Sequence, residues 1–583
     1  MPLKNETSSV GLPLWASWSS SIPSLLSDLP VLAAGLGLFY AFLAVTRYWM
    51  APLHQHAEIQ LNPAVLPKYA AFSVMRIAAA YILSLAFTLV YGYVAAYNAK
   101  AERFMVPLLD TLQSIPVLSF LPGVMVAMMA LFPTRQLGLE LGSILLIFTG
   151  QVWNMTFSFY SSLKNIPAEM REVTRVYRWS WWQRFIQMEM PFATIGLVWN
   201  SMMSVAGGWF FLMACETFVL GNRDLRLPGL GSYLQTAANA GDTRAIFWGV
   251  LVMIGVIVLI DQLIWRPVIA WAEKFKFEQV EAAETPHSPV LDLLRSSRIL
   301  PLIARVSFRP ALERMNLYFV KRGADRPAAS RPGAAARWFS RAALALLVAG
   351  IGYAIVKMCA LLATTRGSEL RTIFIGAGAT FLRVEFTLAL AALWTIPVGV
   401  MIGLHPKLSA ITQPIAQVAA SVPATALFPI VLLMLIRAGG GLGIGSLVLL
   451  LLGTQWYILF NVIAGASALP TDLKEVCDIF EFGRLERWRK LILPGIFPYL
   501  ITGFVTASGG AWNASIVAEY FHFRGRTYST TGLGAVISGA TDNGNFRVLL
   551  AATIVMAAMV VTINRLLWRR LYTLASAKYK LEV

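Results

Sequence analysis

Long apolar segments alternate with short polar loops along this chain. About 20 apolar residues are enough for a helix to cross a hydrocarbon core of about 30 Å. Because backbone polar groups must find their partners inside the bilayer, each such segment predicts an α-helix. The predicted spans cover residues 31–50, 70–98, 105–132, 139–163, 192–220, 245–271, 340–364, 375–404, 411–436, 443–465, 495–520 and 546–570.

The two halves of the chain repeat each other. Matched positions include Pro116 and Pro423, Pro122 and Pro429, Trp209 and Trp512, and Glu216 and Glu519. The offset is 307 residues for the proline pairs (423 − 116) and 303 for the later pairs (512 − 209). An offset that stays constant within each of these regions, through such residues, indicates a duplicated module. An even number of spans per module gives both modules the same orientation, which is a parallel repeat.

The same pattern predicts the domain organisation. We expect an N-terminal segment (1–30), a first transmembrane module (31–272), a linker (273–337), a second transmembrane module (338–572) and a tail (573–583). Lys and Arg gather in the linker and in the loop before the fifth span of each module. The positive-inside rule therefore places these loops and both termini in the cytoplasm. The predicted fold class is an all-α polytopic membrane protein with two parallel-repeat modules of about six transmembrane helices each.

Composition supports a membrane protein. Of the 583 residues, 57% are hydrophobic and 13% are charged, against about 25% charged residues in soluble proteins. Nucleic-acid binding is one explanation of the net charge of +18. Clustering of the basic residues in particular loops fits the positive-inside rule better, so we expect contact with a lipid bilayer and no nucleic-acid partner. The three cysteines have no metal-ligand spacing, and we expect no metal site.

The two basic loops share a spacing from Glu to Pro. Glu172 precedes Pro191 by 19 residues (191 − 172), and Glu475 precedes Pro494 by the same distance (494 − 475). Both loops also carry aromatic residues. A single loop of this kind is an ordinary basic cytoplasmic loop, but its duplication with preserved spacing favours an element that docks a partner.

This spacing resembles the EAA loop of binding-protein-dependent ABC importer permeases, in which Glu-Ala-Ala is followed by Gly and then by Ile-x-Leu-Pro. The family's glycine position is occupied here by Arg178 and Glu481. The resemblance covers about residues 65–270 and 370–572 and is closest to the nitrate/taurine/sulfonate group. It implies a type I ABC importer-like fold with both transmembrane subunits fused in one chain.

The resemblance also implies partners and a location. In this family, two short helices of the loop dock into a groove of the ATPase and pass its closure to the membrane helices. The resemblance therefore implies two copies of an ABC ATPase subunit, an extracytoplasmic solute-binding protein and the bacterial inner membrane. The implied coupling residues are Glu172, Arg175, Trp182, Pro191, Glu475, Asp478, Trp488 and Pro494.

The chain has no Gly-x4-Gly-Lys-Ser/Thr motif, which is the loop that cradles nucleotide phosphates. We therefore expect no ATP site of this kind in the chain. The resemblance implies that ATP and Mg²⁺ are bound by the partner subunits, so that this chain has no cofactor and no enzymatic activity of its own.

Proline pairs and membrane carboxylates indicate a solute path. Unwound backbone at membrane depth is tolerated where protein or a water-filled cavity covers it, so matched broken helices point to the path. A carboxylate near the bilayer centre costs about 2.5–3.5 kcal/mol, so it should face a cavity or a partner. The residues expected on the path are Pro116, Pro122, Trp209, Glu216, Pro423, Pro429, Trp512, Asn513 and Glu519. The alternatives are packing kinks for the prolines and hydration at the outer interface for the carboxylates.

The resemblance implies that the chain is the permease component of an ATP-driven ABC importer, which forms the path of a small-molecule solute between its two halves and couples to separate ATPase subunits through the two loops. The alternative is an ion-gradient-driven secondary transporter with twelve helices, because Glu216 and Glu519 could serve ion coupling. A membrane-embedded enzyme is a third possibility, but no catalytic dyad, metal cluster or nucleophile motif supports it. The solute itself is not identified by the sequence.

Overall fold

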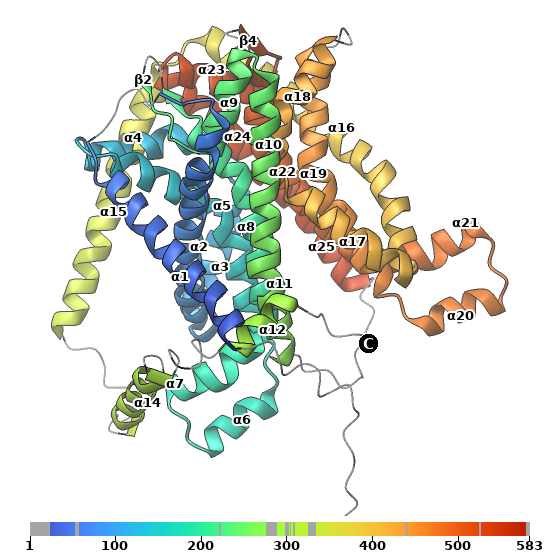
Figure 1. The fold of residues 1–583 in the computed structure, drawn as a ribbon. Coiled ribbons are helices and arrows are strands. Elements are labelled where there is room, and N and C mark those ends of the chain that lie inside the picture. Colours follow the sequence, from blue (N-terminus) through green and yellow to red (C-terminus); the bar gives the residue numbers. More distant parts are fainter. Residues whose placement is uncertain are drawn as a thin grey trace, which may run out of the picture. The chain divides into compact units, whose positions relative to one another are not determined.

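The computed structural model describes residues 24–52, 58–220, 223–275, 288–297, 302, 305–306, 309–324, 334–437, 439, 441–523 and 526–578 (Figure 1). The predicted N-terminal segment, linker and tail therefore lie partly outside the described residues. Two compact units are present. The first consists of Met1–Thr46, Asn165–Val198 and Leu259–Ala329, and the second of Arg47–Lys164, Trp199–Val258 and Ser330–Val583.

Helices make up nearly all of the described first half. They are α1 (Ser24–Trp49), α2 (Leu66–Tyr97), α3 (Ala99–Ser114), α4 (Leu121–Leu131), α5 (Leu137–Lys164), α6 (Ala168–Val176), α7 (Trp181–Arg184), α8 (Met190–Glu216), α9 (Leu230–Ala240), α10 (Thr243–Ile260) and α11 (Arg266–Ala272). Short 3₁₀ turns are η2 (Pro63–Val65), η3 (Val117–Phe120) and η6 (Glu273–Phe275), and π-helical turns are η4 (Phe185–Glu189) and η5 (Asp261–Trp265). Helices α12 (Pro289–Ser296) and α14 (Arg309–Ala324) lie in the predicted linker.

The second half repeats this order. Its helices are α15 (Ala334–Ala363), α16 (Gly367–Leu404), α17 (Pro406–Ser421), α18 (Ala424–Arg437), α19 (Leu442–Ser467), α20 (Thr471–Ile479), α21 (Arg484–Arg487), α22 (Leu493–Ala518), α23 (Leu533–Asp542), α24 (Phe546–Ile563) and α25 (Arg569–Lys578). The π-helical turns are η8 (Trp488–Ile492) and η9 (Asn564–Trp568).

Eight helices in the described part of the chain are long and apolar enough to cross a membrane, or up to ten if each bent pair counts as one span. The other two predicted spans, 139–163 and 340–364, are also helical, as α5 and α15. Helix α5 is less apolar because it carries Glu140 and Gln151, both buried. The predicted all-α, polytopic fold class is confirmed.

Small residues let the long helices of the second unit pack closely. Helix α2 packs against α5, and α19 packs against both α16 and α22. A Cβ atom on Gly403 would lie 2.6 Å from the carbonyl oxygen of Ile463, and one on Gly399 would lie 2.8 Å from Val462. Glycine at these positions therefore brings the α16 and α19 backbones together, as small residues do in membrane helix pairs.

Both third spans are broken at the first proline of each pair, whereas Pro122 and Pro429, which were also expected to break the spans, lie inside α4 and α18. Residues 99–113 and 117–131 meet at 85°, and residues 407–421 and 424–435 meet at 83°. Pro116 lies at the first break and Pro423 at the second. The proline ring fixes φ and disfavours a helical residue before it, which explains why both helices end there.

Two predicted spans are too long at their carboxyl ends. The spans ending at residues 220 and 520 were expected to be helical throughout, but α8 ends at Glu216 and α22 at Ala518. Antiparallel hairpins follow, formed by β1 (Val219–Leu220) with β2 (Arg223–Asp224) and by β3 (Tyr520–Phe523) with β4 (Arg526–Ser529). The apolar pattern does not separate a buried strand from the end of a helix, so it missed the hairpins.

Each EAA-like loop is a helix, a tight turn and a second helix. Arg178 and Glu481, at the family's glycine position, both have φ of 50°. The amide of Arg178 donates to the carbonyl of Arg175, and the next amide, of Trp179, donates to that of Thr174. In the second loop, the Glu481 amide likewise donates to the carbonyl of Asp478, and the Phe482 amide donates to that of Cys477. This is a Schellman motif, which places a left-handed residue after a helix.

We expect the turn to accept glycine and to reject a β-branched residue. A left-handed conformation costs about 1–2 kcal/mol for an ordinary residue and more for valine. Glu481→Val should therefore speed tryptic cleavage in α20–α21 by roughly 10-fold in the detergent-solubilised chain, whereas Glu481→Gly should not. Glu486→Val, at a right-handed exposed position of α21, is the matched control. Equal cleavage of both valine variants would contradict the assignment of strain to position 481.

Candidate functional site

A cavity of about 460 Å³ lies in the second unit, and both sequence modules line it. The first module contributes η3, α4, α8, α9 and the β1–β2 hairpin, and the second contributes α18, α22, β3 and α23. Pro122 and Pro429, which are equivalent in the repeat, both line the cavity. Its volume lies in the range of about 300–1,000 Å³ that is typical of small-molecule sites.

The charged groups of the cavity lining are paired with each other. Arg226 forms an ion pair with Asp224, and its Nη1 donates to Thr236 at 3.0 Å. Asp542 accepts hydrogen bonds at 2.7 Å from the Tyr520 hydroxyl and from His522 Nε2. Burial, followed by the bond to Asp542, raises the pKa of Tyr520 above its usual value. The Tyr520 phenol therefore remains a neutral donor.

The rest of the lining is mainly apolar. Leu118, Leu121, Phe218 and Ile516 are among its residues. Thr425 also lines the cavity, and its hydroxyl is buried without a hydrogen-bond partner in the described part of the chain. A buried hydroxyl of this kind is costly unless a ligand or water satisfies it.

Contacts between the modules satisfy the unwound backbone after Pro116. Asn513 Oδ1 accepts a bond of 3.5 Å from the Leu118 amide, and Thr553 Oγ1 donates to the Ser119 carbonyl at 3.1 Å. The structure thus brings Asn513 next to the break in the other module. Trp209 and Trp512 are 1% and 0% exposed and do not line the cavity.

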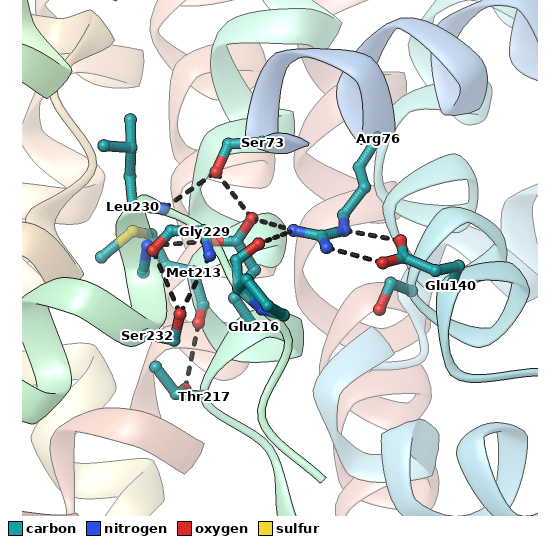
Figure 2. A network of polar contacts seen from close by, with 12 residues as sticks. Ser73, Arg76, Glu140, Met213, Glu216, Thr217, Gly229, Leu230 and Ser232 are labelled. Carbon is teal, nitrogen blue, oxygen red and sulfur yellow. Dashed lines mark hydrogen bonds and ion pairs between the residues drawn. The ribbon is translucent and has the colours of Figure 1, made fainter. Parts of the chain in front are cut away.

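Glu216 lies in a buried ion-pair network at the carboxyl end of α8 (Figure 2). Arg76 of α2 donates from Nη1 to Glu216 at 2.7 Å, and from Nε and Nη2 to both oxygens of Glu140 at 2.7 Å. Ser73 donates to Glu216 at 2.7 Å, and the Gly231 amide at the start of α9 donates to its other oxygen at 2.7 Å. The side chains of Arg76, Glu140 and Glu216 are 0% exposed.

Glu519 lies in the equivalent network of the second module. Arg383 of α16 forms an ion pair with Glu519, and its Nη2 donates to the Thr531 carbonyl at 3.0 Å. Thr380 donates to Glu519 at 2.8 Å, and the Gly534 amide donates at 2.8 Å. Each carboxylate thus lies at the amino-terminal end of a short helix, where the helix dipole favours negative charge.

The alternative that these glutamates are hydrated at the outer interface is wrong, because both are 0% exposed. Neither carboxylate lines the cavity. The glycines before and within α9 and α23 explain the close packing: a Cβ on Gly229 would overlap the Glu216 carboxylate, and one on Gly532 would overlap that of Glu519. The assignment of Glu216 and Glu519 to the solute path remains a prediction.

Comparison with known proteins identifies the family. Residues 88–264 and 395–575 each match the family described as binding-protein-dependent transport system inner membrane component. The chain belongs to this family. It is a multi-pass inner-membrane permease with two tandem copies of the family's domain.

Three relatives show the range of permeases that resemble it. A nitrate import permease protein of Leptolyngbya laminosa is 27% identical over 188 residues, which cover 32% of this chain and 64% of the relative. A bicarbonate transport system permease protein of Synechococcus elongatus is 26% identical over 200 residues, 34% of this chain and 69% of the relative. A putative aliphatic sulfonates transport permease protein of Bacillus subtilis is 23% identical over 207 residues, 35% of this chain and 70% of the relative.

Each family domain of the permease contains one EAA-like loop. Glu172 and Arg175 of α6 are exposed, as is Glu475 of α20. Asp478 pairs with Arg487 of α21 at 2.5 Å. Pro191 and Pro494 lie in the first turns of α8 and α22, where proline is well tolerated.

The aromatic residues of the two loops differ in their surroundings. Trp182 stacks on Phe319 of α14, with ring centroids 5.2 Å apart, and Trp181 meets the same ring edge-on at 5.9 Å. Trp488 of the second loop is half-buried at the start of η8. The linker helix α14 therefore covers part of the first loop. The coupling role of all these loop residues remains a prediction.

The sequence reasoning on the permease missed Ser73, Arg76 and Glu140, and Thr380 and Arg383 in the second module. A signal was available. Ser73 and Arg76, three residues apart in an apolar span, are matched by Thr380 and Arg383 at the offset of 307 (383 − 76). An arginine in a membrane span needs a partner.

We expect Arg76→Met to destabilise the permease more than Arg383→Met. Loss of Arg76 leaves two buried carboxylates without a cation, and breaking a buried pair costs about 3–5 kcal/mol. Arg383 is 12% exposed and has one carboxylate partner, so its loss should cost less. Denaturant unfolding of the detergent-purified chain measures the loss of stability in both variants. The double variant Arg76→Met with Glu140→Gln should recover part of the lost stability. An Arg76→Met variant as stable as wild type would contradict the role of the network.

Proposed function

We propose that this chain is the fused permease of an ATP-driven importer. Its two modules enclose the solute path, and separate ATPase subunits dock at the two EAA-like loops. The observation that carries this proposal is the cavity to which both family domains contribute equivalent elements. The ATPase subunits and an external solute-binding protein are proposed from the family.

The second module supports a path that connects two sides of a membrane. Helix α22 has 26 residues, about 39 Å at 1.5 Å per residue, which exceeds a hydrocarbon core of about 30 Å. The α20–α21 loop precedes α22, and β3, which lines the cavity, follows it. Basic residues of the loop favour the cytoplasmic side. The β3 end then faces outward, where solute enters.

The α20–α21 loop carries an apolar surface that fits a partner. Ile479, Phe480 and Leu485 are 76%, 69% and 75% exposed. Exposed apolar side chains gathered on a loop outside the membrane mark an interaction site. In this proposal the ATPase covers them, while Glu475 on α20 forms the polar edge of the contact.

The cavity lining favours a solute with a carbon skeleton. The relatives are named for nitrate, bicarbonate and aliphatic sulfonates. Of these solutes, an aliphatic sulfonate best fits the apolar lining around Leu121 and Ile516, with its polar end near Thr425. A small inorganic oxyanion would leave most of this apolar surface without contact.

Removal of both loop glutamates should release the ATPase. The tagged chain is extracted gently from its own membranes, and co-purified proteins are identified by mass spectrometry. Wild type should retain an ATPase that carries a P-loop, and Glu172→Ala with Glu475→Ala should retain at least 5-fold less. Glu169→Ala with Asp472→Ala removes the same charge from the same two helices and is the matched control. If an intact wild-type chain retains no ATPase even after cross-linking, an ion-coupled carrier becomes the better explanation.

Substitution of Thr425 should affect transport without affecting ATPase binding. In proteoliposomes with the co-purified ATPase and binding protein, Thr425→Trp should narrow the cavity and strongly reduce uptake of an aliphatic sulfonate. The isosteric Thr425→Val removes only a hydrogen bond to solute, so KM should rise roughly 5–10-fold, as a lost bond of about 1–1.5 kcal/mol predicts. Normal uptake by Thr425→Trp would rule out this cavity as the path.

A further inference from the structure

The two ion-pair networks differ at one position. Gly142 of α5 packs against Met125, and Gly445 of α19 packs against Leu432. These contacts align the two helices at the offset of 303 (445 − 142), so Glu140 corresponds to Gly443 (443 − 140). The first module therefore has a carboxylate where the second module has no side chain.

The missing carboxylate changes the contacts of the arginine. Arg76 places Nε and Nη2 on Glu140, each at 2.7 Å. Arg383 places Nη1 on Glu519 and Nη2 on the Thr531 carbonyl, and its Nε has no hydrogen-bond partner among the described residues. The side chain of Arg383 is nevertheless 88% buried (12% exposed).

Open space lies beside this guanidinium. Apart from its chain neighbours and its own helical turn, a Cβ atom on Gly443 would meet no atom closer than Thr530 Oγ1, at 4.0 Å, and Gly443 is itself exposed, so this space opens to the surface. The same hydroxyl lies 3.4 Å from Arg383 Nη2. Thr530 thus borders both the arginine and the space at Gly443, which is where the Glu140 side chain begins in the first module.

Charge also differs between the networks. The first network contains one cation and two carboxylates, whereas the second contains one of each. A guanidinium binds planar oxyanions through two parallel N–H bonds, which are strong when partly desolvated. The Nε of Arg383 is not among the fully buried atoms that lack a partner, so it is accessible and can donate to an anion.

We propose that Arg383 and Thr530 bind a small planar oxyanion, of the size of formate, bicarbonate or nitrate, in the place that the Glu140 carboxylate fills in the first module. Arg383 donates to the anion from Nε, and the Thr530 hydroxyl donates to a second oxygen. Arg383, Gly443 and Thr530 do not line the cavity, so this site is separate from the proposed solute path. The proposal does not depend on the coupling of the permease to an ATPase.

The test uses sodium formate as the probe and the detergent-purified full chain. Thermal unfolding is followed as formate replaces chloride at constant ionic strength. A ligand that binds the folded state raises the midpoint with concentration, and we expect a rise on the order of 1–2 °C for wild type. Gly443→Glu supplies the carboxylate within the chain, so its midpoint should not respond. Gly443→Ala adds no carboxylate and should keep the wild-type response.

Two further variants make the result decisive. Glu140→Gly opens the equivalent space in the first module, so formate should raise its midpoint more than that of wild type. Thr530→Val keeps the Arg383–Glu519 pair and removes the hydroxyl, so half-maximal response should require several-fold more formate. Equal formate responses of wild type, Gly443→Glu and Thr530→Val would overturn the proposal. If Gly443→Glu does not fold, an unchanged response of Thr530→Val overturns it alone.

Discussion

Burial of a carboxylate in an apolar environment is the constraint on which this structure depends. Glu216 and Glu519 are fully enclosed, and a lone ionised carboxylate there would cost far more than a fold can tolerate. Each is therefore held by an arginine from an earlier helix and by an amide of a following short helix. One buried charge thus ties three separate helices of each module together. The glycines beside these carboxylates leave the room that they occupy.

The order of helices could be predicted from the sequence because it depends on local patterns. Apolar length predicts the spans, and Pro116 and Pro423 predict the two breaks. The repeat offset places equivalent elements in both modules. The repeat marks Arg76 as an arginine that needs a partner, but its pairing with Glu216, 140 residues away, and with Glu140 of a third helix could not be predicted in the same way. Only the packing of α2, α5 and α8 brings such distant groups together.

Local conformation shows a further limit of sequence reasoning. Arg178 and Glu481 occupy a position where the resembled family has glycine, and neither residue type favours φ of 50°. The left-handed turn forms nevertheless, because the preceding helix and its two closing hydrogen bonds determine the conformation. Pro122 and Pro429, which were expected on the solute path, line the cavity. The polar groups from β3 and α23 were not expected, because these elements lie at the end of a predicted span or outside the predicted spans.

The fusion of two modules in one polypeptide has a consequence for how they can change over evolutionary time. A permease built from two identical chains must carry the same residue at both equivalent positions, so any mutation appears twice. Here Glu140 and Gly443 are encoded separately, and each copy of the network can drift or specialise alone. Two separately encoded modules therefore allow one half to keep a rigid, self-contained ion-pair network. The arginine of the other half can come to depend on an anion from its surroundings, as proposed for Arg383.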